Sequence, residues 1–149
     1  MSAGETRVEV KRVYEKPSTF DGTRVLVDRL WPRGLVKNQA EIDTWLREVA
    51  PSDSLRTWFH SHPKEWSSFR RRYLKELSSP EATSALHELY DLAHGRKQLT
   101  LLFSSRNEEH NNAVVLKDLL NGMRKPPTGT GPAGARVARR PQAKSMPRR

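Results

Sequence analysis

The sequence predicts an α/β domain in which a small, mostly parallel sheet is flanked by helices. Three apolar segments, at residues 7–14, 23–31 and 98–103, are typical of strands, and segments with helical apolar spacing separate the second from the third. The chain of 149 residues is 35% hydrophobic, which suffices for one ordinary core. Because the composition changes abruptly after residue 123, we expect one domain over residues 1–123 and a disordered basic tail, rich in proline and glycine, over residues 124–149.

Each predicted strand has its own signature. Residues 7–14 begin with the alternation of polar and apolar side chains that characterises a half-buried strand. Three successive apolar side chains in residues 23–31 indicate a strand that is covered on both faces, and residues 98–103 form a second apolar run. Residues 38–50 fit either a short helix or a strand, so the sheet has room for an additional strand near residues 40–50.

Four segments carry apolar side chains at helical spacing together with signals for helix starts and ends. The last of these helices is expected from about Asn107 to Asn121. The signals are, in chain order, Ser52, Pro63 and the pair Ser79-Pro80 as helix starts, with Gly95 and Gly122 as helix ends.

The net charge of +10 is distributed unevenly along the chain. Eight of the 27 basic residues and none of the 17 acidic residues lie in residues 124–149, which leaves 19 basic against 17 acidic residues, a charge of +2, for residues 1–123. The nearly neutral domain lacks the electrostatic signature of a nucleic-acid-binding protein, whereas the tail has it.

Several classes of protein and site are excluded by what the sequence lacks. It contains no cysteine, so disulfides, a thiolate nucleophile and cysteine metal sites are excluded. No apolar run approaches the roughly 18 residues of a membrane span and the N-terminus has no apolar leader, so we expect a cytoplasmic protein with no membrane partner. We expect no metal site, because His60 and His62 fall at a predicted helix junction without carboxylates beside them. The pattern G-x-G-x-x-G at residues 129–134 lies in the tail, without the strand and helix that a dinucleotide site needs.

Charged residues follow two of the predicted strands at their carboxyl ends. Asp28, Arg29 and Arg33 follow the apolar part of one strand, and Arg106 follows the other. Because parallel strands that lie side by side bring their carboxyl ends to one edge of a sheet, we expect these side chains to converge there. Guanidinium groups in such a place can bind a phosphate or carboxylate through paired donors.

The first turn of the last predicted helix contributes Asn107 and His110, next to N–H groups that favour an anion. We therefore take Arg29, Arg33, Arg106 and Asn107 as candidate ligand-binding residues and Asp28 and His110 as candidate catalytic acid–base residues. The alternative interpretation is a structural network in which Asp28 pairs with an arginine and Asn107 caps the helix. Glu108 and Glu109 in the first turn favour this alternative, because their charges already satisfy the helix dipole and would repel an anion.

The same residues resemble those of the family named domain of unknown function 488, in its YeaO-like branch. The similarity spans about residues 7–121, and the string Asp28-Arg29-Leu30-Trp31-Pro32-Arg33-Gly34 is its most specific part. The resemblance implies a small bacterial-type α/β protein without an established activity. Other branches of the family place a cysteine-containing loop where this chain has Ser104 to Asn111, so thiol chemistry does not apply here. The further matching segments are 11–15, 21–27, 50–52, 58–59, 69–73 and 106–111.

Three functional hypotheses follow from these observations. The first is an enzyme or a sensor that binds a small anionic ligand, nucleotide-like or phosphorylated, at the strand ends. The second is a nucleic-acid-associated protein that uses the basic tail and Arg70 to Arg72. The third is an interaction module in which the arginines are structural. The sequence names no cofactor, reaction class or oligomeric state, and whether the chain is an enzyme stays open at this point.

Overall fold

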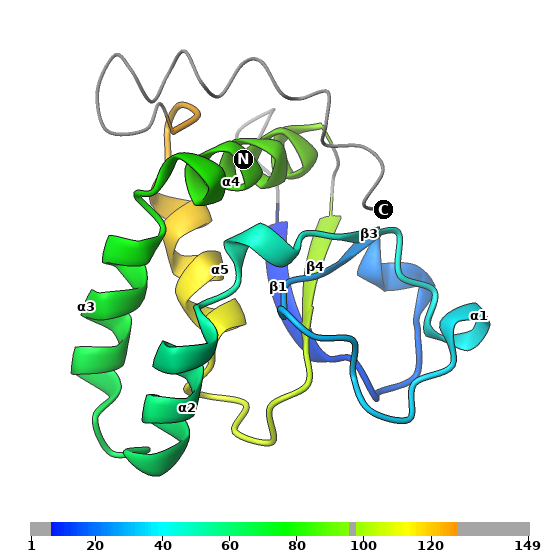
Figure 1. Cartoon of the computed structure of the whole chain (residues 1–149). Coiled ribbons are helices and arrows are strands. Elements are labelled where there is room, and N and C mark those ends of the chain that lie inside the picture. Colours follow the sequence, from blue (N-terminus) through cyan, green and yellow to red (C-terminus); the bar gives the residue numbers. More distant parts are fainter. Residues whose placement is uncertain (1–6, 96–97, 128–149) are drawn as a thin grey trace.

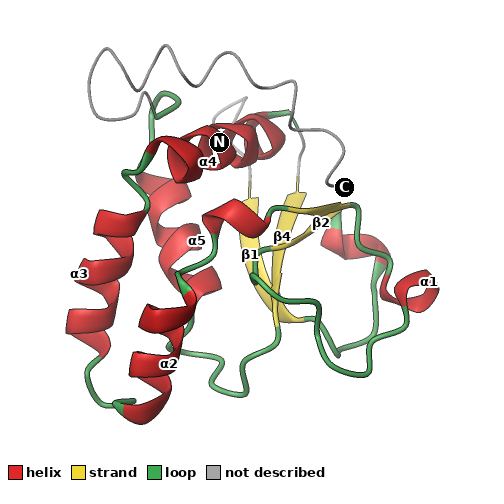
Figure 2. Cartoon of the chain, viewed as in Figure 1, coloured by secondary structure: helices red, strands yellow, loops and turns green. Residues whose placement is uncertain are grey.

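The computed structural model describes residues 7–95 and 98–127, and these form a four-stranded, all-parallel sheet with helices packed against it (Figures 1 and 2). The strands are β1 (Arg7–Arg12), β2 (Thr23–Leu26), β3 (Thr44–Trp45) and β4 (Gln98–Phe103). Their order in the sheet is β1-β4-β2-β3. The predicted α/β class and parallel sheet are therefore confirmed, and the tail beyond residue 127 lies outside the described residues.

Strand β4 is central although it comes last in sequence. It pairs with β1 on one side, where Val10 lies opposite Leu101, and with β2 on the other, where Val25 lies opposite Leu101. The β4 strand is bounded as predicted, because its apolar run is fully buried from Leu99 to Phe103. All three longer strands consequently end at one edge of the sheet, toward which β1 and β4 run downward in Figure 1.

Besides the strands, the described residues contain four longer helices and three short helical turns. Helices α2, α3 and α5 lie on one side of the sheet, and α4 crosses above them in the view of Figure 2. Within residues 7–95 and 98–127, no helix combines the length and apolar character needed to cross a bilayer. The elements are η1 (Thr19–Asp21), α1 (Lys37–Ala40), η2 (Arg47–Val49), α2 (Asp53–Ser61), α3 (Trp66–Glu76), α4 (Pro80–His94) and α5 (Asn112–Gly122).

Two helix starts agree with the sequence prediction and are explained by capping. The Ser52 hydroxyl accepts a hydrogen bond from the N–H of Leu55, which begins α2. The Ser79 hydroxyl accepts one from the N–H of Ala82 at the start of α4, with Pro80 as the first helical residue. In both cases the side chain satisfies an N–H group that has no partner within its helix.

Other boundaries differ from the prediction. Pro63 does not begin a helix, because the Glu65 N–H binds the His62 carbonyl in a turn and α3 begins only at Trp66. The additional strand expected near residues 40–50 is present as β3, and the rest of residues 38–50 holds the end of α1 and the turn η2.

The last helix begins later than predicted, at Asn112 instead of about Asn107. Asn107 is not its cap: the Asn107 side-chain oxygen accepts from the N–H groups of Glu109 and His110, which forms a local turn in the loop. Asn111 takes the cap position, and its side chain accepts from the N–H of Val114. The predicted 23–31 strand is likewise shorter, since its sheet pairing ends with the Val27 N–H bound to the Leu102 carbonyl.

The core is divided between the two faces of the sheet. Val25, Val27, Leu101 and Phe103 point to the face covered by the helices, and each is at most 1% exposed, as predicted for core positions. A smaller cluster on the opposite face is built on Val13, Leu26 and Leu102. It is covered by Trp31, Leu35 and Ile42 from the loops around α1 and by Trp45 of β3.

A charged cluster lies beside that smaller core. Asp21 accepts hydrogen bonds from Lys11 (3.0 Å) and Arg24 (2.6 Å), and its backbone carbonyl accepts from the Thr100 hydroxyl (2.7 Å). Burial raises the pKa of Asp21, but the hydrogen bonds from the Ser18 backbone and from both cations outweigh it and hold the pKa below its ordinary value. This cluster anchors the chain at the start of β2.

Candidate functional site

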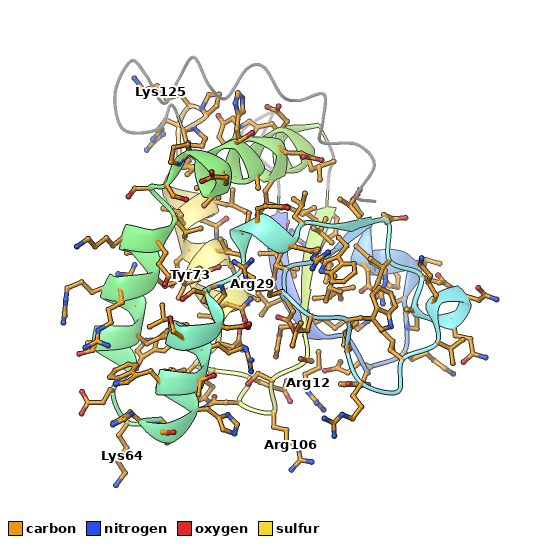
Figure 3. All side chains as sticks on the ribbon, in the orientation of Figure 1. Arg12, Arg29, Lys64, Tyr73, Arg106 and Lys125 are labelled. Atoms are coloured by element: carbon orange, nitrogen blue, oxygen red, sulfur yellow. The ribbon has the colours of Figure 1, made fainter. Side chains whose placement is uncertain are left out.

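The candidate residues lie where β1, β2 and β4 end, but the structure gives them different surroundings. Figure 3 shows Arg29 close to Tyr73, at the helices, and apart from Arg12 and Arg106, which lie at the lower edge of the molecule. The predicted convergence is therefore incomplete. One group of residues is bound within the fold, and another is exposed at the edge.

Asp28 joins three elements. One of its carboxylate oxygens accepts hydrogen bonds from the backbone N–H (2.9 Å) and the hydroxyl (2.7 Å) of Ser104, just after β4. The other accepts from the side-chain amide of Asn112 (3.3 Å), which also donates to the Val27 carbonyl (2.9 Å). Asp28 thus fastens the end of β2 to the end of β4 and to the first residue of α5.

The electrostatics of Asp28 reflect this position. Burial raises its pKa, and the hydrogen bonds from Ser104 and Asn112 oppose the rise without cancelling it. The carboxylate lies beside the first residue of α5, which is where a helix favours negative charge. Asp28 therefore supplies, from within the chain, the anion that we expected a ligand to supply at this helix.

Arg29 holds the segment that leads into α2. Its guanidinium donates to the carbonyls of Ala50 (2.9 Å) and Pro51 (3.1 Å), both of which belong to buried residues. Tyr73 of α3 is fully buried next to it and donates its hydroxyl hydrogen to the Val49 carbonyl. Burial, the main cause, and the negative charges of Asp28 and Glu76 raise the pKa of Tyr73 well above 10, so its hydroxyl stays protonated as a donor.

A second group forms around Arg12, which is not among the candidate residues predicted from the sequence. The Arg12 guanidinium donates to the carbonyls of Ser104 and Ser105, both at 2.9 Å, and lies 5.0 Å from the centre of the Tyr14 ring. The Tyr14 hydroxyl donates to the Arg33 carbonyl (2.8 Å). These contacts bring the end of β1 next to the Arg33 loop and to the loop that carries Arg106.

The position of Arg12 at the end of a strand is the feature from which its place in the site could have been predicted. Residues 7–14 were predicted as one strand, which put Arg12 inside it, whereas β1 ends at Arg12. A strand that pairs with β4 in parallel must end at the same edge as β4. Counting Arg12 as a strand-end cation would have placed it with Arg33 and Arg106.

The loop between β4 and α5 is held by its own side chains and by α3. Asn107 organises its turn, and its carbonyl accepts from the Asn111 side chain (2.8 Å). The His110 ring stacks on Trp66 of α3, with ring centres 4.5 Å apart and planes 12° apart. Among the described residues, no hydrogen bond joins His110 to Asp28, so the two candidate catalytic groups have separate partners.

The arginines at this edge have no carboxylate partners in the part of the chain that the structure describes. In residues 7–95 and 98–127, none of Arg12, Arg33 and Arg106 forms an ion pair. The pair between Asp28 and an arginine, which the structural-network interpretation requires, is not formed there either, because Asp28 is bound by Ser104 and Asn112 instead. Arg33 and Arg106 are exposed, so their guanidinium groups face solvent.

No metal centre is present among the described residues: no three side chains of the ligating types come together. His62 stacks on Trp58, and its Nδ1 lies 2.9 Å from the Trp58 carbonyl. The His60-Ser61-His62 segment therefore ends α2 by local contacts.

Comparison with known proteins places this chain in a family. The family described as the inactive DUF488-N3 subclade matches residues 7–131. The chain is 42% identical over 118 residues to the uncharacterized protein Rv3073c of Mycobacterium tuberculosis, which covers 79% of this chain and 97% of that protein. It is 41% identical over 116 residues to the uncharacterized protein YeaO of Escherichia coli, which covers 78% of this chain and 98% of that protein. No solved structure matches the chain. The chain therefore belongs to the inactive DUF488-N3 subclade, as a YeaO-like member of the DUF488 family.

Proposed function

We propose that this protein binds a small anionic ligand, nucleotide-like or phosphorylated, at the carboxyl edge of its sheet. The observation that carries the proposal is the group formed by Arg12, Arg33 and Arg106, which we call the edge arginines. They lie on three segments that contact one another through Tyr14 and Ser105, and no carboxylate of the described residues neutralises them.

The edge arginines carry positive charge that no ion pair of the described residues compensates. Three guanidinium groups at one edge repel one another, and a dianion that lies between them removes the repulsion and accepts paired hydrogen bonds. Two charged hydrogen bonds at about 1.5–3 kcal/mol each give about 3–6 kcal/mol. That corresponds to a dissociation constant from roughly several millimolar to tens of micromolar, which suits a metabolite.

The geometry favours binding over catalysis. The carboxylate of Asp28 has three hydrogen bonds within the fold, and His110 is stacked on Trp66. The family description calls the subclade inactive. An acid–base role for Asp28 and His110 stays a prediction, and Arg29 and Asn107 support the site by holding its loops in place.

Calorimetric titration of the full chain with inorganic phosphate, ribose 5-phosphate and adenosine monophosphate tests the proposal. We expect binding by the native chain and at least about a tenfold loss in the double variant Arg33→Ala/Arg106→Ala, which removes two of the charges. Arg71→Ala on α3 is the matched control, because Arg71 is also an exposed arginine without a carboxylate partner among the described residues. Equal losses in control and double variant, or no binding of any probe by the native chain, would refute the proposal.

A second candidate function is nucleic-acid binding through residues 124–149. Its support is the sequence alone: eight cations and no acid lie in this segment, most of which is outside the described residues. If all eight charges contact phosphates, the logarithm of the affinity for duplex DNA should fall with the logarithm of salt concentration at a slope of about −7. DNA titrations of the full chain and of a chain ending at residue 127 would test this, and equal affinities would reject it.

A further inference from the structure

Beyond charge, the edge has an exposed aromatic ring that is fixed in place. Tyr14 is 44% exposed, yet its hydroxyl is bound to the Arg33 carbonyl and its ring is in contact with the Arg12 guanidinium. A surface tyrosine held at both its ring and its hydroxyl has already lost much of its rotational freedom. Binding of a ligand to the ring therefore costs the tyrosine side chain little further conformational entropy.

The Tyr14 side chain leaves exposed surface on which such a ligand can pack. Arg12 is the cation that lies over the ring, and no other aromatic ring of the described residues packs on it. A guanidinium on one side also makes the ring a good partner for a flat, electron-rich system on the other, because it draws the ring's electron density toward itself. Purine and pyrimidine bases are flat and stack on tyrosine in this way.

Exposed apolar surface is concentrated in the same loops. The described residues expose four large hydrophobic side chains. One of them is Tyr14 itself, and two more, Leu30 and Val36, lie in the segment around Arg33. Scattered single side chains need no explanation, but apolar surface next to unneutralised arginines is typical of a binding site with a polar and an apolar half.

We infer that the ligand of the edge arginines is a nucleoside phosphate whose phosphate binds Arg33 and Arg106 and whose base stacks on Tyr14. This inference rests on the proposed function and adds the planar base as the specificity element. Base stacking on an aromatic side chain is strong enough to raise affinity by roughly fivefold to a hundredfold. Adenosine monophosphate should consequently bind at least about fivefold more tightly than ribose 5-phosphate, which lacks only the base.

Two variants of Tyr14 separate stacking from loop positioning. Tyr14→Leu removes the ring, so adenosine monophosphate and ribose 5-phosphate should bind this variant with the same affinity. Tyr14→Phe keeps the ring and loses the hydrogen bond to Arg33, so most of the preference for adenosine monophosphate should remain. Phe20→Leu is the control, because Phe20 is an aromatic residue whose side chain is 86% exposed and which does not belong to the group of Tyr14 and the edge arginines.

Calorimetry with the full chain, supported by saturation-transfer NMR on the base protons, reads out these affinities. A 5′-phosphorylated hexanucleotide is titrated as well. If it binds more tightly than the mononucleotide, and if Tyr14→Leu abolishes this gain in affinity, the source of the nucleotide is the end of a nucleic-acid strand. If ribose 5-phosphate binds as tightly as adenosine monophosphate to the native chain, or Tyr14→Leu keeps the preference, the inference is wrong while the anion site stands. If none of the phosphate compounds binds, the proposed function fails as well.

Discussion

Two regions at the same edge of the sheet carry the same types of residue and use them differently. Asp28 and Arg29 direct their polar atoms at groups of the chain itself, and they fix α5 and the segment before α2. Arg33 and Arg106 are exposed, and the described chain offers them no acceptor for their side chains. A charged side chain at a strand end is thus structural when the fold uses its hydrogen bonds, and it is available to a ligand when the fold leaves them unused.

The largest stability effect should come from Asp28. Asp28→Ala leaves the Ser104 N–H, the Ser104 hydroxyl and the Asn112 amide without their acceptor, so we expect a loss of about 2–4 kcal/mol in the free energy of unfolding. Asp53→Ala is the matched control, because Asp53 is exposed and has only a 3.4 Å ion pair with Arg56. Urea denaturation measures both, and a loss no greater than in the control would remove the distinction between the two regions.

A smaller loss is expected at Arg29. Arg29→Ala deprives the Ala50 and Pro51 carbonyls of their donor and should cost about 1–3 kcal/mol, because both residues are buried. Arg33→Ala serves as the comparison, since the hydrogen bond from the Tyr14 hydroxyl goes to the Arg33 backbone carbonyl, which that substitution keeps. If the two variants unfold at the same urea concentration, Arg29 is not structural.

The pH dependence of stability should identify Asp28 as well. Its pKa is raised in the folded protein, so the folded state binds more protons than the unfolded state, and stability falls as pH rises from the ordinary value of 3.8 to the folded pKa. Asp21 acts in the opposite sense: with a lowered pKa it contributes stability above 3.8 that is lost as the pH falls through its folded pKa.

The measurement compares Asp28→Asn with the native chain in urea titrations at several pH values above 4. The decline in stability with rising pH should be weaker in the variant, because the titrating group is gone. An unchanged slope in this range would mean that Asp28 is not perturbed in the way that its burial implies.

The smallest stability effect is expected at Arg106. Arg106→Ala removes one of several like charges and breaks no described hydrogen bond, so the free energy of unfolding should stay within about 0.5 kcal/mol of the native value or rise slightly. Thermal unfolding without ligand checks this. A loss as large as that of Arg29→Ala would place Arg106 in the structural region and would weaken the proposal of an anion site.

The elements that the sequence predicts well are those with local causes. The apolar run of β4 and the Ser79-Pro80 start of α4 need no information from elsewhere in the chain, and both agree with the structure. The predicted start of α5 was wrong, because Asn107 and Asn111 are both residues that cap helices well. The two are distinguished by contacts with distant parts of the chain: His110 stacks on Trp66, and Asp28 binds Asn112.

The division of the candidate site could not be predicted for a similar reason. Arg29 and Arg33 are four positions apart in one segment, and their roles differ because the carbonyls of Ala50 and Pro51 come within reach of one and not of the other. That proximity depends on the path of the chain after β3, which the ambiguous pattern at 38–50 did not reveal. The edge and its charges were predictable, whereas the partner of each charge was not.

The strand order has a consequence for how the chain folds. β1 and β2 do not pair with each other. Both pair with β4, which begins only at Gln98. Until that segment joins them, the one native strand pairing that the described part of the preceding chain can form is the short one between β2 and β3. Formation of the sheet therefore requires contacts between residues far apart in sequence, which slows folding, and the apolar strands before β4 stay exposed to aggregation during that interval. The segment that completes the sheet thus also sets how long the nascent chain depends on protection.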